Sequence, residues 1–189
     1  GFCVDVCDEG YYNISANSHC FICKNLTYSF EKNKVPFRKI ILLNASLMGF
    51  VSELEAENLV IGIASPEYIY SEKIDQLLKS GKIQNVGNEQ KYDVEKIISM
   101  KPDAIFTNHI ASFDNTYELL KNNGIQVVFL DEYMEQKPLE KTAYIKLFGE
   151  FLGKEKEAEA RYQEVEKNYS ELKKLASTAK EKPVVLANE

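Results

Sequence analysis

The sequence predicts an α/β fold, in which a lobe built on a mostly parallel sheet with helical crossovers leads into a long inter-lobe helix. Strand-like and helix-like segments alternate from Val35 onward, apolar residues recur at helical spacing between Gly153 and Pro183, and the first 34 residues are rich in β-forming residues. We therefore divide the chain into a small N-terminal β-hairpin appendage (1–34), an α/β lobe (35–153), a connecting helix (154–180) and the first strand of a second lobe (181–189), the rest of which is missing.

The appendage begins with two β-rich runs, residues 2–7 and 11–16, separated by the turn sequence Asp8-Glu9-Gly10. This pattern predicts a β-hairpin. A further strand is expected over residues 26–30.

All four cysteines lie in the appendage, at Cys3, Cys7, Cys20 and Cys23. Their spacing resembles that of a four-ligand zinc site, but a strand over residues 2–7 would separate Cys3 from Cys7 by roughly 13 Å along one face. The pattern favours disulfides formed in an oxidising compartment over zinc, with free buried thiols as a third alternative. Four cysteines permit three pairings, and the sequence does not choose among them.

The lobe is predicted to begin with a strand, a helix, a second strand and a second helix, followed by a short extended segment and a third helix. Asp93 is expected to cap the third helix, and Pro102 to end it. The predicted ranges are 39–43, 46–56, 59–64, 72–78, 83–87 and 94–100.

The rest of the lobe is predicted to contain a strand at 104–107, a helix at 115–122 ended by Asn123-Gly124, a strand at 125–130 and a helix at 139–152. A helix of about 23 residues, roughly 35 Å long, should follow. Its apolar positions form one stripe, comprising Ala158, Tyr162, Val165, Tyr169, Leu172 and Ala176.

Several function classes are disfavoured by composition and by missing motifs. A net charge of −6 argues against a nucleic-acid surface, and no apolar run reaches the roughly 18 residues that would span a bilayer. The N-terminus lacks an export-signal pattern, so we expect any such signal to have been removed. The turn after the first strand of the lobe lacks both glycine-rich phosphate-binding patterns, and there is no nucleophile elbow. We therefore predict a protein that is not an enzyme and has no cofactor.

Ligands of open α/β sheets bind beyond the carboxyl ends of the strands. There the predicted sheet presents polar and aromatic side chains without a paired nucleophile and base, a set that suits binding a bulky, partly apolar ligand. The alternative is that these are ordinary loop residues, and His109 is better explained as a hydrogen-bonded loop residue than as a metal ligand. The candidates are Asn44, Ser46, Ser65, Tyr68, Tyr70, Asn108, His109 and Tyr133, with Asp131 and Glu132 beside the last.

Several stretches, in this order and spacing, resemble one family. They are Arg38 to Asn44, Leu59 to Ile63, Ile83 to Gly87, Tyr92 to Ile97, Lys101 to Ile105, Gly124 to Val128 and Phe148 to Glu159. On these, residues 38–188 resemble the N-terminal lobe and connecting helix of the class III, helical-backbone substrate-binding proteins of ABC transporters, which carry vitamin B12, haem or ferric siderophores. Residues 1–34 resemble extensions of Bacteroidetes-type members.

The resemblance implies two lobes joined by a rigid helix, a ligand cleft between them, and docking of both lobes onto a membrane permease. In this family a glutamate of each lobe pairs with permease arginines, and the matching position here is Glu95. The local pattern agrees, because burial of Val94, Ile97 and Ile98 would turn Glu95 outward; a favourable helix-dipole interaction is the alternative role. The family's ligand loops correspond to residues 44–48, 65–70, 108–112 and 131–133.

The expected function is therefore that of the substrate-binding component of an ABC importer, which captures a corrinoid, ferric siderophore or haem and delivers it to permease subunits. The expected location is the periplasm or the outward-facing cell envelope, with a lipid anchor as one means of attachment. Two alternatives stay open. One is a zinc or manganese binding protein of a related importer, although such proteins use several histidines and only His109 is available in the lobe. The other is a non-transport interaction module acting through residues 1–34.

Overall fold

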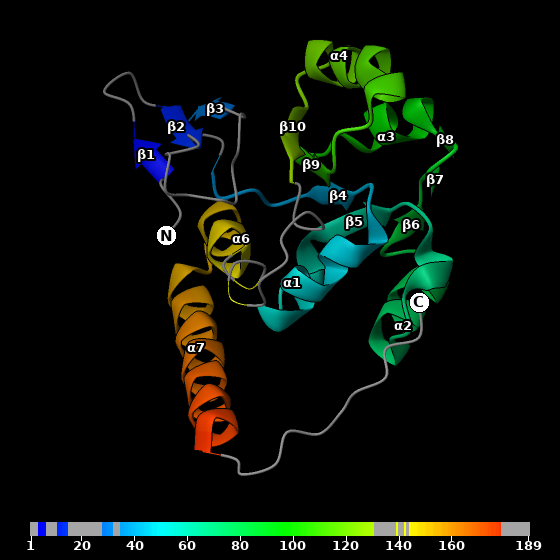
Figure 1. Cartoon of the computed structure of the whole chain (residues 1–189). Coiled ribbons are helices and arrows are strands. Elements are labelled where there is room, and N and C mark those ends of the chain that lie inside the picture. The colour runs from blue at the N-terminus through cyan, green and yellow to red at the C-terminus, as the bar shows by residue number, and fades with distance from the viewer. Residues whose placement is uncertain are drawn as a thin grey trace.

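The computed structural model describes residues 4–6, 11–14, 28–31, 35–130, 139, 142 and 144–178. The lobe within these ranges is built on a five-stranded sheet in the order β10-β9-β4-β5-β6, in which every neighbouring pair is parallel (Figure 1). The strands are β4 (Ile40–Leu42), β5 (Val60–Ile63), β6 (Gln84–Asn85), β9 (Ala104–Thr107) and β10 (Gln126–Phe129). The predicted parallel sheet is confirmed.

Helices cover both faces of this sheet, as Figure 1 shows for α1 and α2 on one side and α3 and α4 on the other. They are α1 (Met48–Glu53), α2 (Glu72–Lys79), α3 (Val94–Met100), α4 (Asp114–Asn122) and α6 (Tyr144–Leu152). Because side chains alternate along a strand, β4 contributes to two cores. Ile40 and Leu42 pack with α1, α2 and α6, whereas Ile41 packs with α3 and α4.

Two predicted elements differ from the structure. The expected helix over 46–56 is a 3-10 turn, η3 (Ala45–Leu47), followed by the short α1, and a left-handed Glu55 (φ 52°) lies just beyond it. The extended segment 83–87 divides between β6 and a separate antiparallel pair, β7 (Gly87–Asn88) with β8 (Lys91–Tyr92). Gly87 makes this change of direction with φ 111°, where an added Cβ would collide with the Lys91 carbonyl oxygen.

The predicted cap of α3 is confirmed, because the Asp93 carboxylate accepts a hydrogen bond of 3.1 Å from the backbone N–H of Lys96. In α2, the Ser71 hydroxyl accepts in the same way from Ile74 at 3.4 Å. Since α2 follows β5 and α3 follows β6 and the β7–β8 pair, both helices begin at the side of the sheet where β5 and β6 end.

A hairpin of α6 and α7 (Glu155–Thr178) closes one face of the lobe. The turn between them is Gly153, with φ 68°. Lys146 of α6 lies 3.1 Å from Glu159 and 4.0 Å from the centre of the Tyr162 ring, both on α7. The pairing of residues early in α6 with residues well along α7 makes the two helices antiparallel.

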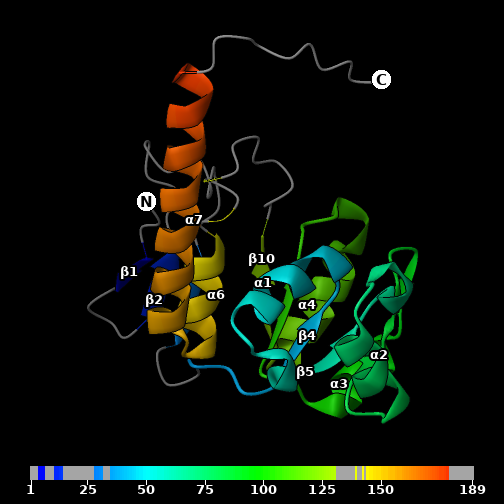
Figure 2. The same cartoon turned by 90° about the horizontal axis from the view of Figure 1, so that it is seen from below.

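Helix α7 has 24 residues, so the long helix is confirmed. Its apolar stripe is buried only at the start. Ala158 is buried and Val165 half-buried, whereas Tyr169, Leu172 and nearby Leu175 are exposed. Figure 2 shows the reason: α7 runs back along α6 and continues well past the start of α6, on the side where β10 ends. The thirteen residues that follow Val165, ending at Thr178, would carry it about 20 Å further.

In the N-terminal segment, the structure describes three antiparallel strands in the order β1-β2-β3, namely β1 (Val4–Val6), β2 (Tyr11–Ile14) and β3 (Tyr28–Glu31). Val4 pairs with Ile14, and Ile14 also pairs with Tyr28. The hairpin strands and the third strand are thus present. Cys3, Cys7, Cys20 and Cys23, the turn at Asp8-Glu9-Gly10 and residues 181–189 lie outside the described residues, and the division into domains stays a prediction.

Candidate ligand-binding edge of the sheet

The candidate ligand residues lie together because all five strands of the sheet are parallel. Their carboxyl ends, with the loops that follow, form what we call the carboxyl edge. Asn44 and Ser46 follow β4, Ser65, Tyr68 and Tyr70 follow β5, and Asn108 and His109 follow β9. Tyr133 falls after β10 and lies outside the described residues.

The centre of this edge is a topological switch point. The sheet begins with β4, and the chain then adds β5 and β6 on one side of it. It afterwards returns to add β9 and β10 on the other side of β4. Connections that leave β4 in opposite directions run on opposite faces of the sheet, so the strand order reverses between β4 and β9. Ligands of open α/β sheets bind at this position.

Asn44 and Asn108 meet at the switch point. The Asn44 amide Nδ2 donates to Asn108 Oδ1 at 3.4 Å, while Asn44 Oδ1 accepts from the Ser46 backbone N–H at 3.0 Å and from its hydroxyl at 2.9 Å. The first loop is therefore fixed to the third by side chains that are far apart in the sequence. These neutral amide and hydroxyl groups can exchange hydrogen bonds with a polar ligand.

His109 is held by the elements beside it. Its Nε2 lies 2.7 Å from Asp114 Oδ1, and its ring meets Phe129 edge-to-face with 5.2 Å between centroids. Beneath it, the Tyr117 hydroxyl donates to the Asn108 carbonyl at 3.4 Å and accepts from the Ile110 N–H at 3.3 Å. His109 thus has the contacts of a hydrogen-bonded loop residue.

The loop after β5 combines a buried serine with two exposed tyrosines. Ser65 adopts the left-handed conformation (φ 52°), donates its N–H to the Gly87 carbonyl at 2.9 Å, and keeps its hydroxyl buried without a hydrogen-bond partner among the described residues. Tyr68 is 69% exposed and Tyr70 is 96% exposed. Their rings offer stacking area at little entropic cost, whereas Ser65 sets the course of the loop.

A layer of buried hydroxyl groups supports the edge on the α3/α4 face, and the sequence did not point to it. Thr107 is fully buried and donates to the Asn108 carbonyl at 3.0 Å. Burial, followed by the charge of Tyr117, raises the pKa of Tyr92 to about 12, and burial also raises the pKa of Tyr117. These hydroxyls therefore stay protonated at neutral pH. Tyr117 and Leu120 show ordinary helical spacing, so nothing local marked this role.

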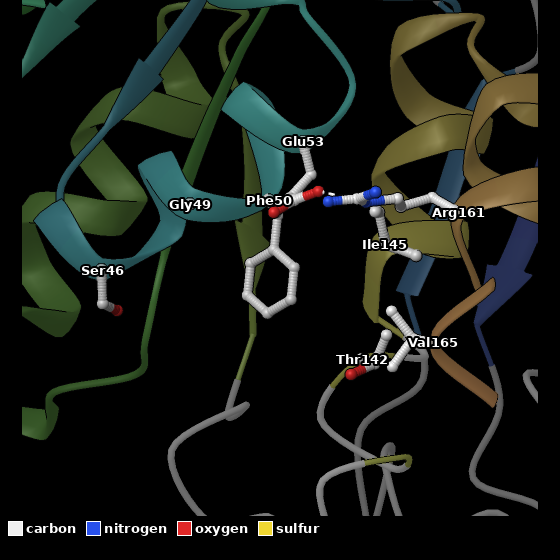
Figure 3. Close-up of a pocket in the computed structure, with 8 residues that line it drawn as sticks. All are labelled: Ser46, Gly49, Phe50, Glu53, Thr142, Ile145, Arg161 and Val165. Atoms are coloured by element: carbon white, nitrogen blue, oxygen red, sulfur yellow. Dashed lines mark hydrogen bonds and ion pairs between the residues drawn. The ribbon is translucent and has the colours of Figure 1, made fainter. Parts of the chain in front are cut away.

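A pocket of about 310 Å³ begins beside Ser46 and runs between α1, α6 and α7. In Figure 3, Phe50 and Ile145 line its apolar part, while the Arg161 guanidinium reaches toward the Glu53 carboxylate. Arg161 pairs with Glu53 and lies 2.7 Å from Glu164. The sequence did not predict this pocket, because its walls come from segments roughly a hundred residues apart. The remaining lining residues are Gly49, Thr142 and Val165.

Glu95 lies in the first turn of α3 and is exposed, as its position in the helical pattern predicted. Its neighbour Lys96 turns back and donates from Nζ to the Asn85 carbonyl at 2.9 Å. The Glu95 carboxylate is therefore accessible to a partner approaching the side of the sheet where α3 begins.

Two features are absent from the described residues. In these ranges, no three His, Cys, Asp or Glu side chains gather closely enough to hold a metal ion. Nor does any described helix combine the length and apolar character needed to cross a membrane.

A family model described as periplasmic binding protein matches residues 40–189. The chain belongs to this family. It is a family of substrate-binding proteins and not of enzymes, in agreement with the sequence prediction. The resemblance to class III substrate-binding proteins is also supported by the fold of solved structures.

Three similar proteins illustrate the relationship. An uncharacterized lipoprotein of Methanocaldococcus jannaschii is 29% identical over 146 residues, which are 74% of this chain and 35% of the lipoprotein. A periplasmic haem-binding protein of Pseudomonas aeruginosa has a TM-score of 0.57 at 21% identity, covering 75% of this chain and 47% of that one. The siderophore-binding protein BauB, bound to acinetobactin and ferric iron, has a TM-score of 0.62 at 18% identity, covering 82% and 52%. The chain therefore spans between a third and about half of the length of these proteins.

Proposed function

We propose that this chain forms the first lobe and connecting helix of the substrate-binding component of an ABC importer. The cargo would be a bulky metal chelate, either a corrinoid or a ferric siderophore or haem, captured between two lobes and delivered to a membrane permease. The observation that carries the proposal is the topological switch point of the sheet, where Asn44 and Asn108 meet at 3.4 Å beside a loop with two exposed tyrosines. Membership of a family of binding proteins supports cargo binding at this edge of the sheet.

The course of α7 supports a second lobe facing the carboxyl edge. The apolar stripe that packs on this lobe through Ala158 and Val165 continues as Tyr169 and Leu172, which are exposed beyond the sheet. An exposed apolar stripe on a helix is costly unless another surface covers it. A second lobe packed there would lie opposite the carboxyl edge.

The cellular setting belongs to the same proposal. Capture outside the cytoplasmic membrane requires a periplasmic or outward-facing envelope location, and one relative is named as a lipoprotein. Attachment through a lipid would keep such a binding protein close to its permease.

Ligand titration tests the cargo. We expect the full-length protein to show saturable quenching of tyrosine fluorescence by cyanocobalamin, haemin or a ferric siderophore, with a Kd of micromolar or below. Tyr70→Ala should weaken that binding about fivefold, since stacking on one ring is worth roughly 1 kcal/mol. Leu119→Ala, an exposed apolar residue of α4, is the matched control and should leave the Kd unchanged. If the protein responds to none of these ligands, the proposal of a metal-chelate cargo is refuted.

Docking to the permease is tested at Glu95. We expect Glu95→Gln to weaken binding of the loaded protein to its importer, because a carboxylate at this exposed position would pair with a basic residue of the permease. Glu72→Gln is the matched control, since Glu72 is also exposed in the first turn of a helix but lies on α2, across the sheet from α3. Unchanged affinity after Glu95→Gln would rule out this docking role.

A further inference from the structure

The carboxyl edge carries more negative than positive charge. Its described loops after β4, β5, β6 and β9 are residues 44–47, 64–71, 86–93 and 108–114. Within them the carboxylates are Glu67, Glu89, Asp93 and Asp114, all exposed, and the one lysine or arginine is Lys91. The described loops of the carboxyl edge therefore carry a net negative charge toward a ligand that binds there.

Glu67 lies on the same loop as the exposed tyrosines. It shares the η5 turn (Pro66–Tyr68) with Tyr68, and Tyr70 follows two residues later. The face of a tyrosine ring is itself electron-rich, so it attracts cations and repels anions. Rings and carboxylate on this loop therefore favour the same sign of ligand charge.

The polar groups at the switch point are neutral. Asn44, Ser46 and Asn108 present amide and hydroxyl groups that are linked to one another at 2.9 to 3.4 Å. Such groups match a ligand with amide or hydroxamate groups at its periphery, and they provide no charge to balance carboxylates or catecholates of a ligand.

We infer that the cargo is a metal chelate without net negative charge, such as a corrinoid or a ferric tris-hydroxamate, and not a ferric tris-catecholate or haem with its propionates. This inference rests on the proposed function and narrows its ligand class. Two unit charges about 8 Å apart in water change an affinity about twofold, so one carboxylate disfavours a triply charged anion by about tenfold. A cleft that excludes water increases this effect.

The test compares four probes of different charge on the full-length protein, by titration calorimetry at low ionic strength. They are cyanocobalamin (neutral), ferrioxamine B (cationic), haemin and ferric enterobactin (both anionic). We expect one of the first two to bind at least tenfold more tightly than either anion. Glu67→Lys should improve the affinity for the anionic probes about tenfold or more, and Glu118→Lys on the exposed surface of α4 should improve it clearly less.

The possible failures can be told apart. Tighter binding of haemin or ferric enterobactin by the wild type would overturn the charge inference and leave the proposed function standing. An affinity for anions that Glu67→Lys does not raise, or that Glu118→Lys raises equally, would also overturn it, because the Glu67 carboxylate would then not face the cargo. Binding of none of the four would overturn the proposed function and the inference with it.

Discussion

At the scale of single residues, Ser65 combines two unfavourable features at the carboxyl edge. Its backbone is left-handed, with φ 52°, and its buried hydroxyl has no partner among the described residues. Serine in this conformation costs free energy that glycine would not, and an unpaired buried hydroxyl adds a desolvation penalty. Such local cost at a loop of this edge fits a residue that positions Tyr68 and Tyr70.

Replacing Ser65 with glycine should therefore stabilise the lobe. Lys101 is the matched control, because it has nearly the same φ, 50°, but is exposed at the end of α3. Both glycine variants remove the free-energy cost of the left-handed backbone, and only Ser65→Gly also removes a buried hydroxyl. We expect Ser65→Gly to exceed Lys101→Gly by about 1 kcal/mol in the free energy of unfolding from urea titrations. An equal gain would mean that a water satisfies the hydroxyl.

Two glutamates of the α6/α7 hairpin should respond oppositely to pH. Burial, and then the charge of Glu155, raises the pKa of Glu150, whereas hydrogen bonds from Lys146 and Gln163 lower the pKa of Glu159. Glu150 therefore destabilises the fold when it is ionised, and this penalty disappears as the pH falls below its pKa. Glu159 stabilises the fold above its unfolded pKa, and this contribution is lost as the pH falls through its lowered folded pKa.

We therefore expect Glu150→Gln to raise the thermal midpoint at pH 7. The gain in the free energy of unfolding should be about a few tenths of a kcal/mol, and it should disappear near pH 3. Glu159→Gln should lower the midpoint at pH 7 and also lose its effect at low pH. Thermal unfolding of both variants between pH 3 and pH 7 checks the two signs. Shifts of the same sign at pH 7 would contradict this account.

At the scale of elements, the contact between α6 and α7 depends on one glycine. A Cβ added to Gly149 would overlap the Cβ of Ala158 and lie 3.1 Å from the Lys154 carbonyl oxygen. The Lys154 N–H already donates to the Gly149 carbonyl at 2.7 Å, so the two backbones cannot separate without losing this bond. The tight hairpin holds α7 against the lobe.

Gly149→Ala should accordingly lower the free energy of unfolding by about 1 to 3 kcal/mol, the usual cost of overpacking a tight contact. Gly49 in α1 is the matched control, since nothing lies within 4 Å of an added Cβ there. Gly49→Ala should instead stabilise α1 by about 0.5 to 1 kcal/mol through its helix propensity. Denaturant titrations of the two variants measure both effects, and a Gly149→Ala variant as stable as the wild type would show that the hairpin can open.

Elements with a local sequence signal could be predicted, and those set by distant contacts could not. The strand at Ala104–Thr107 and the cap at Asp93 follow from short patterns. The early end of α1 and the division of residues 83–87 depend on backbone turns at Glu55 and Gly87 that no apolar period reveals. At the site, the strand-end rule brought Asn44 and Asn108 to one edge, but the burial of Ser65 and the Arg161–Glu53 pair come from tertiary packing.

At the scale of the whole molecule, the switch point of the sheet and the projecting half of α7 lie on the same side of the lobe. The sheet presents its switch point at the carboxyl edge, and α7 projects past α6 on the same side with exposed apolar residues (Figure 2). The chain spans 47% of the Pseudomonas aeruginosa haem-binding protein and 52% of BauB. A second lobe seated on the far half of α7 would cover these exposed apolar residues and face the carboxyl edge.

Substitutions on the two halves of α7 test this arrangement. In the 189-residue chain, replacing Leu172 and Leu175 together with glutamine should change the free energy of unfolding by less than about 0.5 kcal/mol, because they are 64% and 66% exposed. Val165→Gln, which alters a wall of the pocket, should cost about 1 kcal/mol in the same chain. In the full-length protein we expect the Leu172 and Leu175 double variant to cost about 2 kcal/mol or more, since the second lobe would then bury both side chains. An equally small effect in both forms would mean that the second lobe does not pack on this face, and that it must approach the carboxyl edge from another direction.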